Sequence, residues 1–138
     1  MLTFQILLSS LTRRNFSPTN NSVDDSLYHE RLATQAAAKA TGTRFLDLNA
    51  ASMAFINSVG RGVADKYNLE DGDRTHLNAH GSVVFGRMVA DLLLGHYPTS
   101  KTPVGVCETE DKFPVGCLTP WIAANQSMTD AIWNGVAV

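Results

Sequence analysis

The chain has 138 residues, of which 44% are hydrophobic and 17% charged, and its formal net charge is −2. This length and composition are typical of one modest globular domain and exclude an intrinsically disordered chain. A charge so close to zero creates no basic field, so we expect neither nucleic acid nor an anionic membrane surface as a partner. Nothing in the composition indicates an oligomeric state.

The first predicted element is a buried strand over residues 2–9, which form a short apolar run with β-compatible side chains. No signal peptide is predicted, because Arg13 and Arg14 follow the apolar run, whereas a secretory signal carries its positive charge before it. The run is also too short to span a bilayer. A buried strand that begins so abruptly predicts that further sequence precedes it.

Residues 10–21 combine arginine, proline and asparagine, which predicts a loop. A helix is predicted over residues 22–41, with Ser22 as its N-terminal cap and Gly42 as its stop. Residues 43–48 alternate between polar and apolar side chains, and this alternation predicts a second strand.

Two more helices are predicted in the middle of the chain, separated by a polar loop over residues 66–77. Asn49 is the expected cap of the first, and Asn78 caps the second, over residues 79–94. The first has one apolar face, formed by Met53, Ile56 and Val59. The second has two adjacent apolar stripes, Val84, Met88, Leu92 and Phe85, Val89, Leu93.

The order of these elements predicts an α/β fold with a parallel sheet covered by helices. Only two strands are visible in the sequence, and a parallel sheet of two strands cannot bury both faces or protect its edges. We therefore expect the sheet to be incomplete, so that the chain is part of a larger domain or pairs with a partner. Residues 1–95 would form this part, and the proline-rich extension 96–138, with a short helix near its end, would pack on it.

Cys107 and Cys117 lie in this extension without a Cys-x-x-Cys spacing, which argues against a thiolate metal site or a thioredoxin-like site. Either they form a small disulfide loop, which requires an oxidising compartment, or they remain free thiols. The sequons at Asn15, Asn20 and Asn125 agree with secretion, although such short motifs also arise by chance.

The stretch most informative about function is the loop before the last of these helices, where Asp73 and His76 stand three positions apart. A carboxylate at this spacing can accept the Nδ1–H of the imidazole, which leaves Nε2 free to take a proton from a hydroxyl nucleophile. One alternative is an incidental surface hydrogen bond. Another is a metal site of Asp73, His76 and His80, which Asn78 and Gly81 disfavour because they interrupt a helical His-x-x-x-His pair. We expect His80 to be an exposed residue of the first helical turn.

The segment Asp73-Arg74-Thr75-His76-Leu77-Asn78, followed by Gly81 and the helix over residues 85–93, resembles the last conserved block of SGNH/GDSL hydrolases. Its D-x-T-H-L-N form is similar to the rhamnogalacturonan acetylesterase branch of that superfamily. Residues 7–16 also resemble a later central strand of this branch and the loop that follows it. The resemblance covers roughly residues 3–95 and is weaker in the rest of the chain.

This resemblance implies a three-layer α/β/α domain of flavodoxin-like type, of which the chain would be the C-terminal portion. It also implies that Asp73 and His76 are catalytic members of a Ser-His-Asp triad, with no cofactor and no metal. The intact family member would be an extracellular esterase, and its substrate an acetylated plant cell-wall polysaccharide of the rhamnogalacturonan kind.

The nucleophilic serine of the family lies in a Gly-Asp-Ser block, and its oxyanion donors lie there and in two further blocks; none of these blocks occurs in this sequence. Ser9, Ser10 and Ser82 are not assigned as nucleophiles, because nothing places them on the required sharp turn. Removal of a triad nucleophile costs a factor on the order of 10⁶ in rate, so we expect the chain alone to have little or no esterase activity.

The alternative function is a non-catalytic protein that binds carbohydrate or a partner chain. Trp121 and Trp133 are candidates for stacking on sugar rings, although tryptophans in such a tail more often pack into the body of the protein. Arg13 and Arg14 either contact an acidic pectic backbone or are two exposed loop charges, and we favour exposed charges.

Overall fold

The computed structural model of the chain describes residues 5–95 and 122–138. Its elements are, in chain order, β1 (Ile6–Leu8), α1 (Tyr28–Thr41), β2 (Arg44–Leu46), α2 (Leu48–Val59), α3 (Arg61–Ala64), the 3₁₀ helix η1 (Asp65–Tyr67), α4 (Ala79–Leu93) and α5 (Gln126–Trp133). Several residues of the sequence analysis lie outside the described part of the chain: residues 2–4, Cys107, Cys117, Trp121 and the prolines of the extension up to residue 121.

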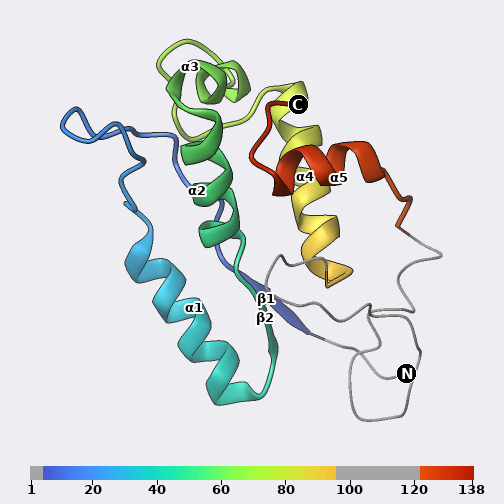
Figure 1. The fold of residues 1–138 in the computed structure, drawn as a ribbon. Coiled ribbons are helices and arrows are strands. Elements are labelled where there is room, and N and C mark those ends of the chain that lie inside the picture. The colour runs from blue at the N-terminus through green and yellow to red at the C-terminus, as the bar shows by residue number, and fades with distance from the viewer. Residues whose placement is uncertain (1–4, 96–121) are drawn as a thin grey trace.

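The two strands pair in parallel, with Leu7 opposite Phe45, and α1 forms the crossover between them. Figure 1 shows α1 on one side of the strands and α4 on the other, with α5 packed across α4. The prediction of an α/β fold with parallel strands is therefore confirmed. No helix within the described residues is long and apolar enough to cross a bilayer.

The first helix begins at Tyr28, so the predicted start at Ser22 is wrong. The residues before it are held in another conformation, in which Phe16 and Val23 form an antiparallel bridge. The backbone N–H of Val23 also donates to Oδ1 of Asn57 at 2.8 Å. Because the side chains of Phe16 and Val23 are both buried, this packing replaces two further turns of helix.

The second helix is capped by Asp47, and the predicted cap at Asn49 is wrong. Oδ1 of Asp47 accepts a backbone N–H of the first helical turn at 3.1 Å, while the same carboxylate pairs with Arg31 of α1. Asn49 lies inside this first turn and is fully buried. The preceding strand therefore ends at Leu46 rather than at Leu48.

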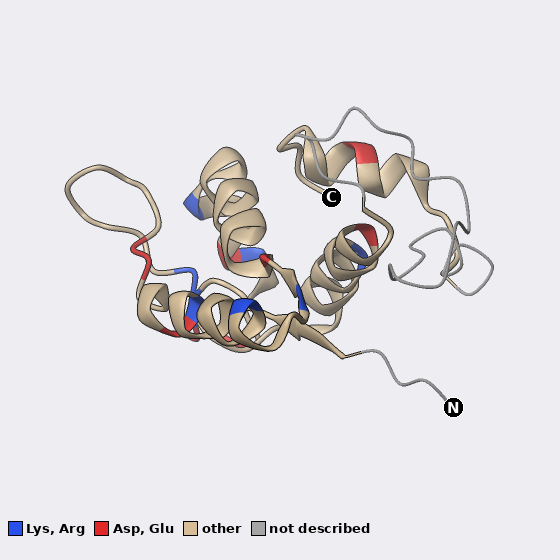
Figure 2. Cartoon of the chain, turned by 90° about the horizontal axis from the view of Figure 1, so that it is seen from below, with Lys and Arg blue, Asp and Glu red and all other residues tan. Residues whose placement is uncertain are grey.

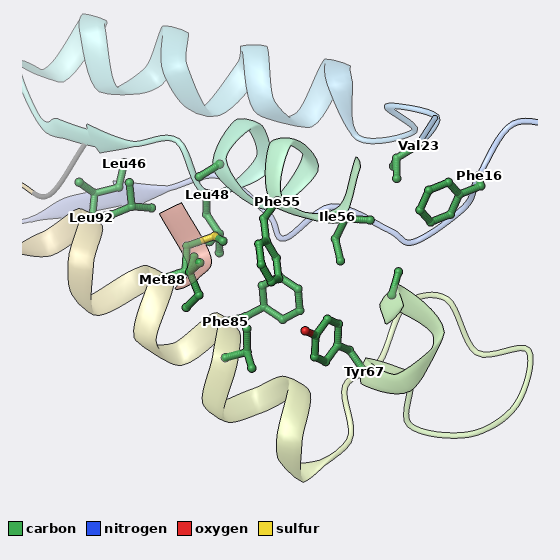
Figure 3. Close-up of a cluster of buried hydrophobic side chains, with 14 residues drawn as sticks. Phe16, Val23, Leu46, Leu48, Phe55, Ile56, Tyr67, Phe85, Met88 and Leu92 are labelled. Atoms are coloured by element: carbon green, nitrogen blue, oxygen red, sulfur yellow. The ribbon is translucent and has the colours of Figure 1, made fainter. Parts of the chain in front are cut away.

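The last predicted helix of the domain, α4, is confirmed together with its cap, because Oδ1 of Asn78 accepts the backbone N–H of Gly81 at 2.8 Å. Of its two apolar stripes, the buried members are Val84, Phe85, Met88 and Leu92. Figure 3 shows Phe85 beside Phe55 of α2 and Tyr67 of η1. These three rings pack with centroids 5.7–6.2 Å apart and join the sheet-covering helices to the start of the loop that carries Asp73.

The C-terminal helix α5 packs against α4 through the carboxylate of Asp91, which is fully buried. Asp91 accepts hydrogen bonds from Nε of Arg87 at 2.8 Å, Oγ1 of Thr129 at 3.0 Å and Nε1 of Trp133 at 3.0 Å. Ile132 adds a buried apolar contact. The helix is therefore attached by both a polar network and the hydrophobic core.

Candidate active site

The loop that carries Asp73 and His76 lies between η1 and α4 and closes on itself. Asn68 and Leu77 form an antiparallel bridge at its base, and the backbone N–H of Leu69 donates to the carbonyl oxygen of His76 at 3.1 Å. At the tip Gly72 has a φ of 80°, a left-handed conformation in which glycine avoids the strain of a side chain. The closed base keeps Asp73 and His76 on one short turn.

The expected contact between the two residues is present. Nδ1 of His76 lies 2.8 Å from Oδ2 of Asp73. The other carboxylate oxygen accepts the backbone N–H groups of Thr75 at 2.8 Å and of His76 at 2.9 Å. The side chain of Asp73 is 16% exposed and that of His76 is 72% exposed, so the acid is shielded while the imidazole reaches into solvent.

These hydrogen bonds determine the charge state of the acid. The backbone N–H groups of His76 and Thr75, followed by the imidazole, lower the pKa of Asp73 to about 2. An ionised carboxylate at this position binds the Nδ1–H tautomer of a neutral imidazole, and the lone pair is then on Nε2. Among the described residues no group forms a hydrogen bond with Nε2 of His76. The arrangement can therefore accept a proton from an incoming hydroxyl group.

Arg14 is fully buried beneath this loop, and the expectation that it is an exposed loop charge is wrong. Its Nε donates to Oδ1 of Asn68 at 2.5 Å, and its Nη2 donates to the carbonyl oxygen of His76 at 2.7 Å. Its backbone N–H donates to the carbonyl oxygen of Arg74 at 2.9 Å. Arg13 beside it is exposed, as expected. Two adjacent arginines in a polar loop contain no signal that one of them is buried.

A second arginine attaches the loop to the 3₁₀ helix η1. Nη1 of Arg74 forms an ion pair with Oδ1 of Asp65 at 2.7 Å. Since both partners are partly exposed, the pair contributes modestly to stability. The chain that leaves the carboxyl end of β1 contacts this loop through Arg14. The pair Asp73 and His76, called the dyad below, therefore lies on the side of the sheet where open α/β folds bind ligands.

The other candidate residues lie elsewhere. Nε2 of His80 is 2.8 Å from the carbonyl oxygen of Val138, and its ring packs on Tyr67 at 5.5 Å between centroids. His80 is exposed, as expected, but it is engaged with the C-terminal segment rather than with His76. Within residues 5–95 and 122–138, no group of three or more His, Cys, Asp and Glu side chains is placed to hold a metal ion.

The serines named in the sequence analysis are also separate from the dyad. Ser9 is buried after β1, where its hydroxyl donates to Oδ1 of Asp47 at 3.2 Å and accepts the backbone N–H of Asn49 at 2.9 Å. Ser10 and Ser82 are exposed. Within the described residues, none of these three serines therefore forms a hydrogen bond with Nε2 of His76.

Comparisons with models of known protein families, with curated proteins and with solved structures each yielded no match. In the part of the chain that the structure describes, charged residues are spread over the helices and loops and do not gather on one element (Figure 2). The carboxylate–imidazole pair is thus the feature of the described chain with the clearest chemical capacity, which is proton transfer to and from a hydroxyl group.

Proposed function

We propose that the chain carries the acid–base half of a serine esterase of the SGNH/GDSL type. His76 is the general base and then the general acid, and Asp73 orients it. The observation that supports this role most directly is the 2.8 Å contact between Nδ1 of His76 and Oδ2 of Asp73. It supports the proposal because an imidazole whose Nδ1 is hydrogen-bonded to a carboxylate keeps Nε2 available to accept the proton of a serine hydroxyl.

The proposed reaction is deacetylation through an acetyl-enzyme intermediate. The nucleophile is the serine of a Gly-Asp-Ser block, which this sequence does not contain. Nε2 of His76 removes the proton of this serine hydroxyl, and the serine oxygen attacks the acetyl carbonyl carbon. The imidazolium then protonates the departing sugar oxygen, and water hydrolyses the acetyl-serine with the same base. Because the pKa of Asp73 is about 2, the carboxylate stays ionised and stabilises the imidazolium without taking its proton.

The substrate proposed is an acetylated plant cell-wall polysaccharide of the rhamnogalacturonan kind, which is supported by the resemblance of residues 73–78 to that branch. The same resemblance supports an extracellular site of action and a flavodoxin-like three-layer domain. Parallel strands with α1 on one side and α4 on the other agree with such layers. Sugar stacking on Trp133 has less support, because its indole N–H donates to the buried Asp91.

A fusion protein tests this proposal by supplying the missing nucleophile. Residues 1–138 are joined behind the N-terminal part of an SGNH acetylesterase that contains a Gly-Asp-Ser block. A fluorophosphonate probe reports the activated serine, and acetate release from acetylated rhamnogalacturonan reports turnover. We expect both signals in the fusion, and we expect His76→Ala to reduce turnover by a factor on the order of 10⁶.

His80→Ala is the matched control, because His80 is an exposed histidine close in sequence that does not contact Asp73. It should keep labelling and turnover near the level of the fusion. The unfused chain should hydrolyse a chromogenic acetate ester no faster than its His76→Ala variant. A folded fusion that reacts equally well with and without His76 would show that the dyad has no catalytic role.

A further inference from the structure

The side chain of Arg14 is unusual because it is fully buried and yet its guanidinium group forms no ion pair with a carboxylate among the described residues. Burial lowers its pKa, while the nearby Asp73 carboxylate acts in the opposite direction. A charge buried in this way is costly unless hydrogen bonds compensate it. Both of its side-chain hydrogen-bond partners belong to the loop that carries the dyad.

These two partners lie at opposite sides of that loop. Asn68 is on the chain that enters it, and the carbonyl oxygen of His76 is on the chain that leaves it, at 2.5 Å and 2.7 Å from the guanidinium nitrogens. The His76 carbonyl also accepts the backbone N–H of Leu69 at 3.1 Å, so two donors hold its peptide group. The direction of the His76 side chain follows from the orientation of this peptide group.

We propose that Arg14 is the positioning residue of the dyad: its planar guanidinium holds the backbone of His76 so that Nδ1 faces Asp73 and Nε2 stays free. This inference rests on the proposed esterase function of Asp73 and His76. A lysine ammonium is a single point charge and cannot reproduce the two diverging hydrogen bonds of the guanidinium. Arg14→Lys therefore keeps the positive charge and removes the pair of hydrogen bonds to Asn68 and His76.

The test measures the tautomer of His76 in the 138-residue chain by nitrogen-15 NMR at a pH where the imidazole is neutral, with His76→Ala used to assign the signal. We expect the Nδ1–H form to dominate in the unchanged chain. In Arg14→Lys the ratio of the Nε2–H to the Nδ1–H form should rise by about tenfold, the size expected when a charge-assisted hydrogen bond is lost.

Arg61→Lys is the control, because Nη2 of Arg61 also donates to a backbone carbonyl, that of Phe16 at 3.1 Å, but does not contact the dyad loop. It should leave the tautomer ratio unchanged. If Arg14→Lys does not fold, Asn68→Ala takes its place in the test. It removes one hydrogen-bond partner of Arg14, and it should shift the tautomer ratio of His76 in the same direction. An unchanged ratio in the folded variant would overturn the proposal.

This measurement needs neither a serine nor a substrate, so its outcome is separable from that of the fusion protein. A tautomer shift without histidine-dependent esterase activity would show that Arg14 positions His76 but that the dyad does not serve an esterase. Esterase activity without a tautomer shift would leave the dyad catalytic and Arg14 a structural residue only.

Discussion

Asp73 is held by hydrogen bonds from its own loop, and two of the three come from backbone N–H groups rather than from a side chain. This origin matters because a backbone donor survives most substitutions. It also means that the loop itself keeps the carboxyl group of Asp73 in its charged form. The dyad is preorganised at the level of single residues, with the imidazole as its exposed member.

The pH dependence of Asp73 follows from these donors. Its ordinary pKa of 3.8 is lowered to about 2, so its contribution to folding stability is complete above about pH 4 and is lost as the pH falls toward 2. In His76→Ala we expect the pKa of Asp73 to stay well below 3.8, since the backbone N–H groups of residues 76 and 75 are the largest causes. Carbon-13 NMR titration of the carboxyl group measures this.

Thr75→Ala is the accompanying control, because it keeps the backbone N–H that donates to Asp73. The titration curve of Asp73 should be nearly unchanged in this variant. A return of the pKa to its ordinary value in His76→Ala would show that the imidazole, and not the backbone, holds the acid in its charged form.

At the scale of elements, the loop depends on how closely α4 approaches the 3₁₀ helix η1. The backbone N–H of Asn78 donates to the carbonyl oxygen of Tyr67 at 3.1 Å, and Gly81 of α4 lies directly above that carbonyl. A Cβ at Gly81 would come within 2.7 Å of the Tyr67 carbonyl oxygen and 3.1 Å of Leu77 Cδ2. Position 81, in the first turn of α4, therefore has room only for glycine.

Gly81→Ala should destabilise the chain by about 1–3 kcal/mol, because the helix must move away from the backbone of Tyr67. Gly86→Ala in the same helix is the matched control, since a Cβ there meets nothing within 4 Å. It should stabilise the chain by about 0.5–1 kcal/mol through helix propensity alone. Urea denaturation followed by circular dichroism measures both, and equal effects of the two substitutions would contradict the role of Gly81.

At the scale of the whole molecule, the buried carboxylate of Asp91 attaches α5 to the domain together with buried apolar contacts. Asp91 accepts hydrogen bonds from its own helix and from two residues of α5. By contrast, α1 packs only loosely on its side of the sheet. Ala38 is its only buried residue, and Leu32 of α1 and Leu8 of β1 are 39% and 40% exposed. The core therefore lies mainly between the sheet, α2, α4 and α5.

Asp91→Ala should cost about 3–5 kcal/mol, because it leaves the nearly buried guanidinium of Arg87 without its anionic partner. Asp130→Ala is the control on α5, and it should change stability by less than about 0.5 kcal/mol, because among the described residues the exposed carboxylate of Asp130 accepts a hydrogen bond only from Gln126. Urea denaturation gives the free energies, and hydrogen exchange shows whether α5 loses protection first. Similar losses in both variants would contradict the anchoring role of Asp91.

Several features were predictable from the sequence because their causes are local. The contact of Asp73 with His76, the cap at Asn78 and the apolar stripes of α4 all join residues within a few positions of each other. A turn or a helix brings such residues together whatever the rest of the chain does. The parallel pairing of the strands also followed, because a helix between two strands leaves few other topologies.

Only the tertiary structure decided the features whose partners lie far apart in the sequence. Arg14 is buried by contacts 54 and 62 residues away, and the bridge between Phe16 and Val23 delays the start of α1 until Tyr28. Local patterns do not record such contacts, because a charged or capping residue has the same short-range preferences whether or not a distant partner is present. The sequence thus determined the contact of Asp73 with His76, and the tertiary structure added a buried arginine that donates to the backbone of the same loop.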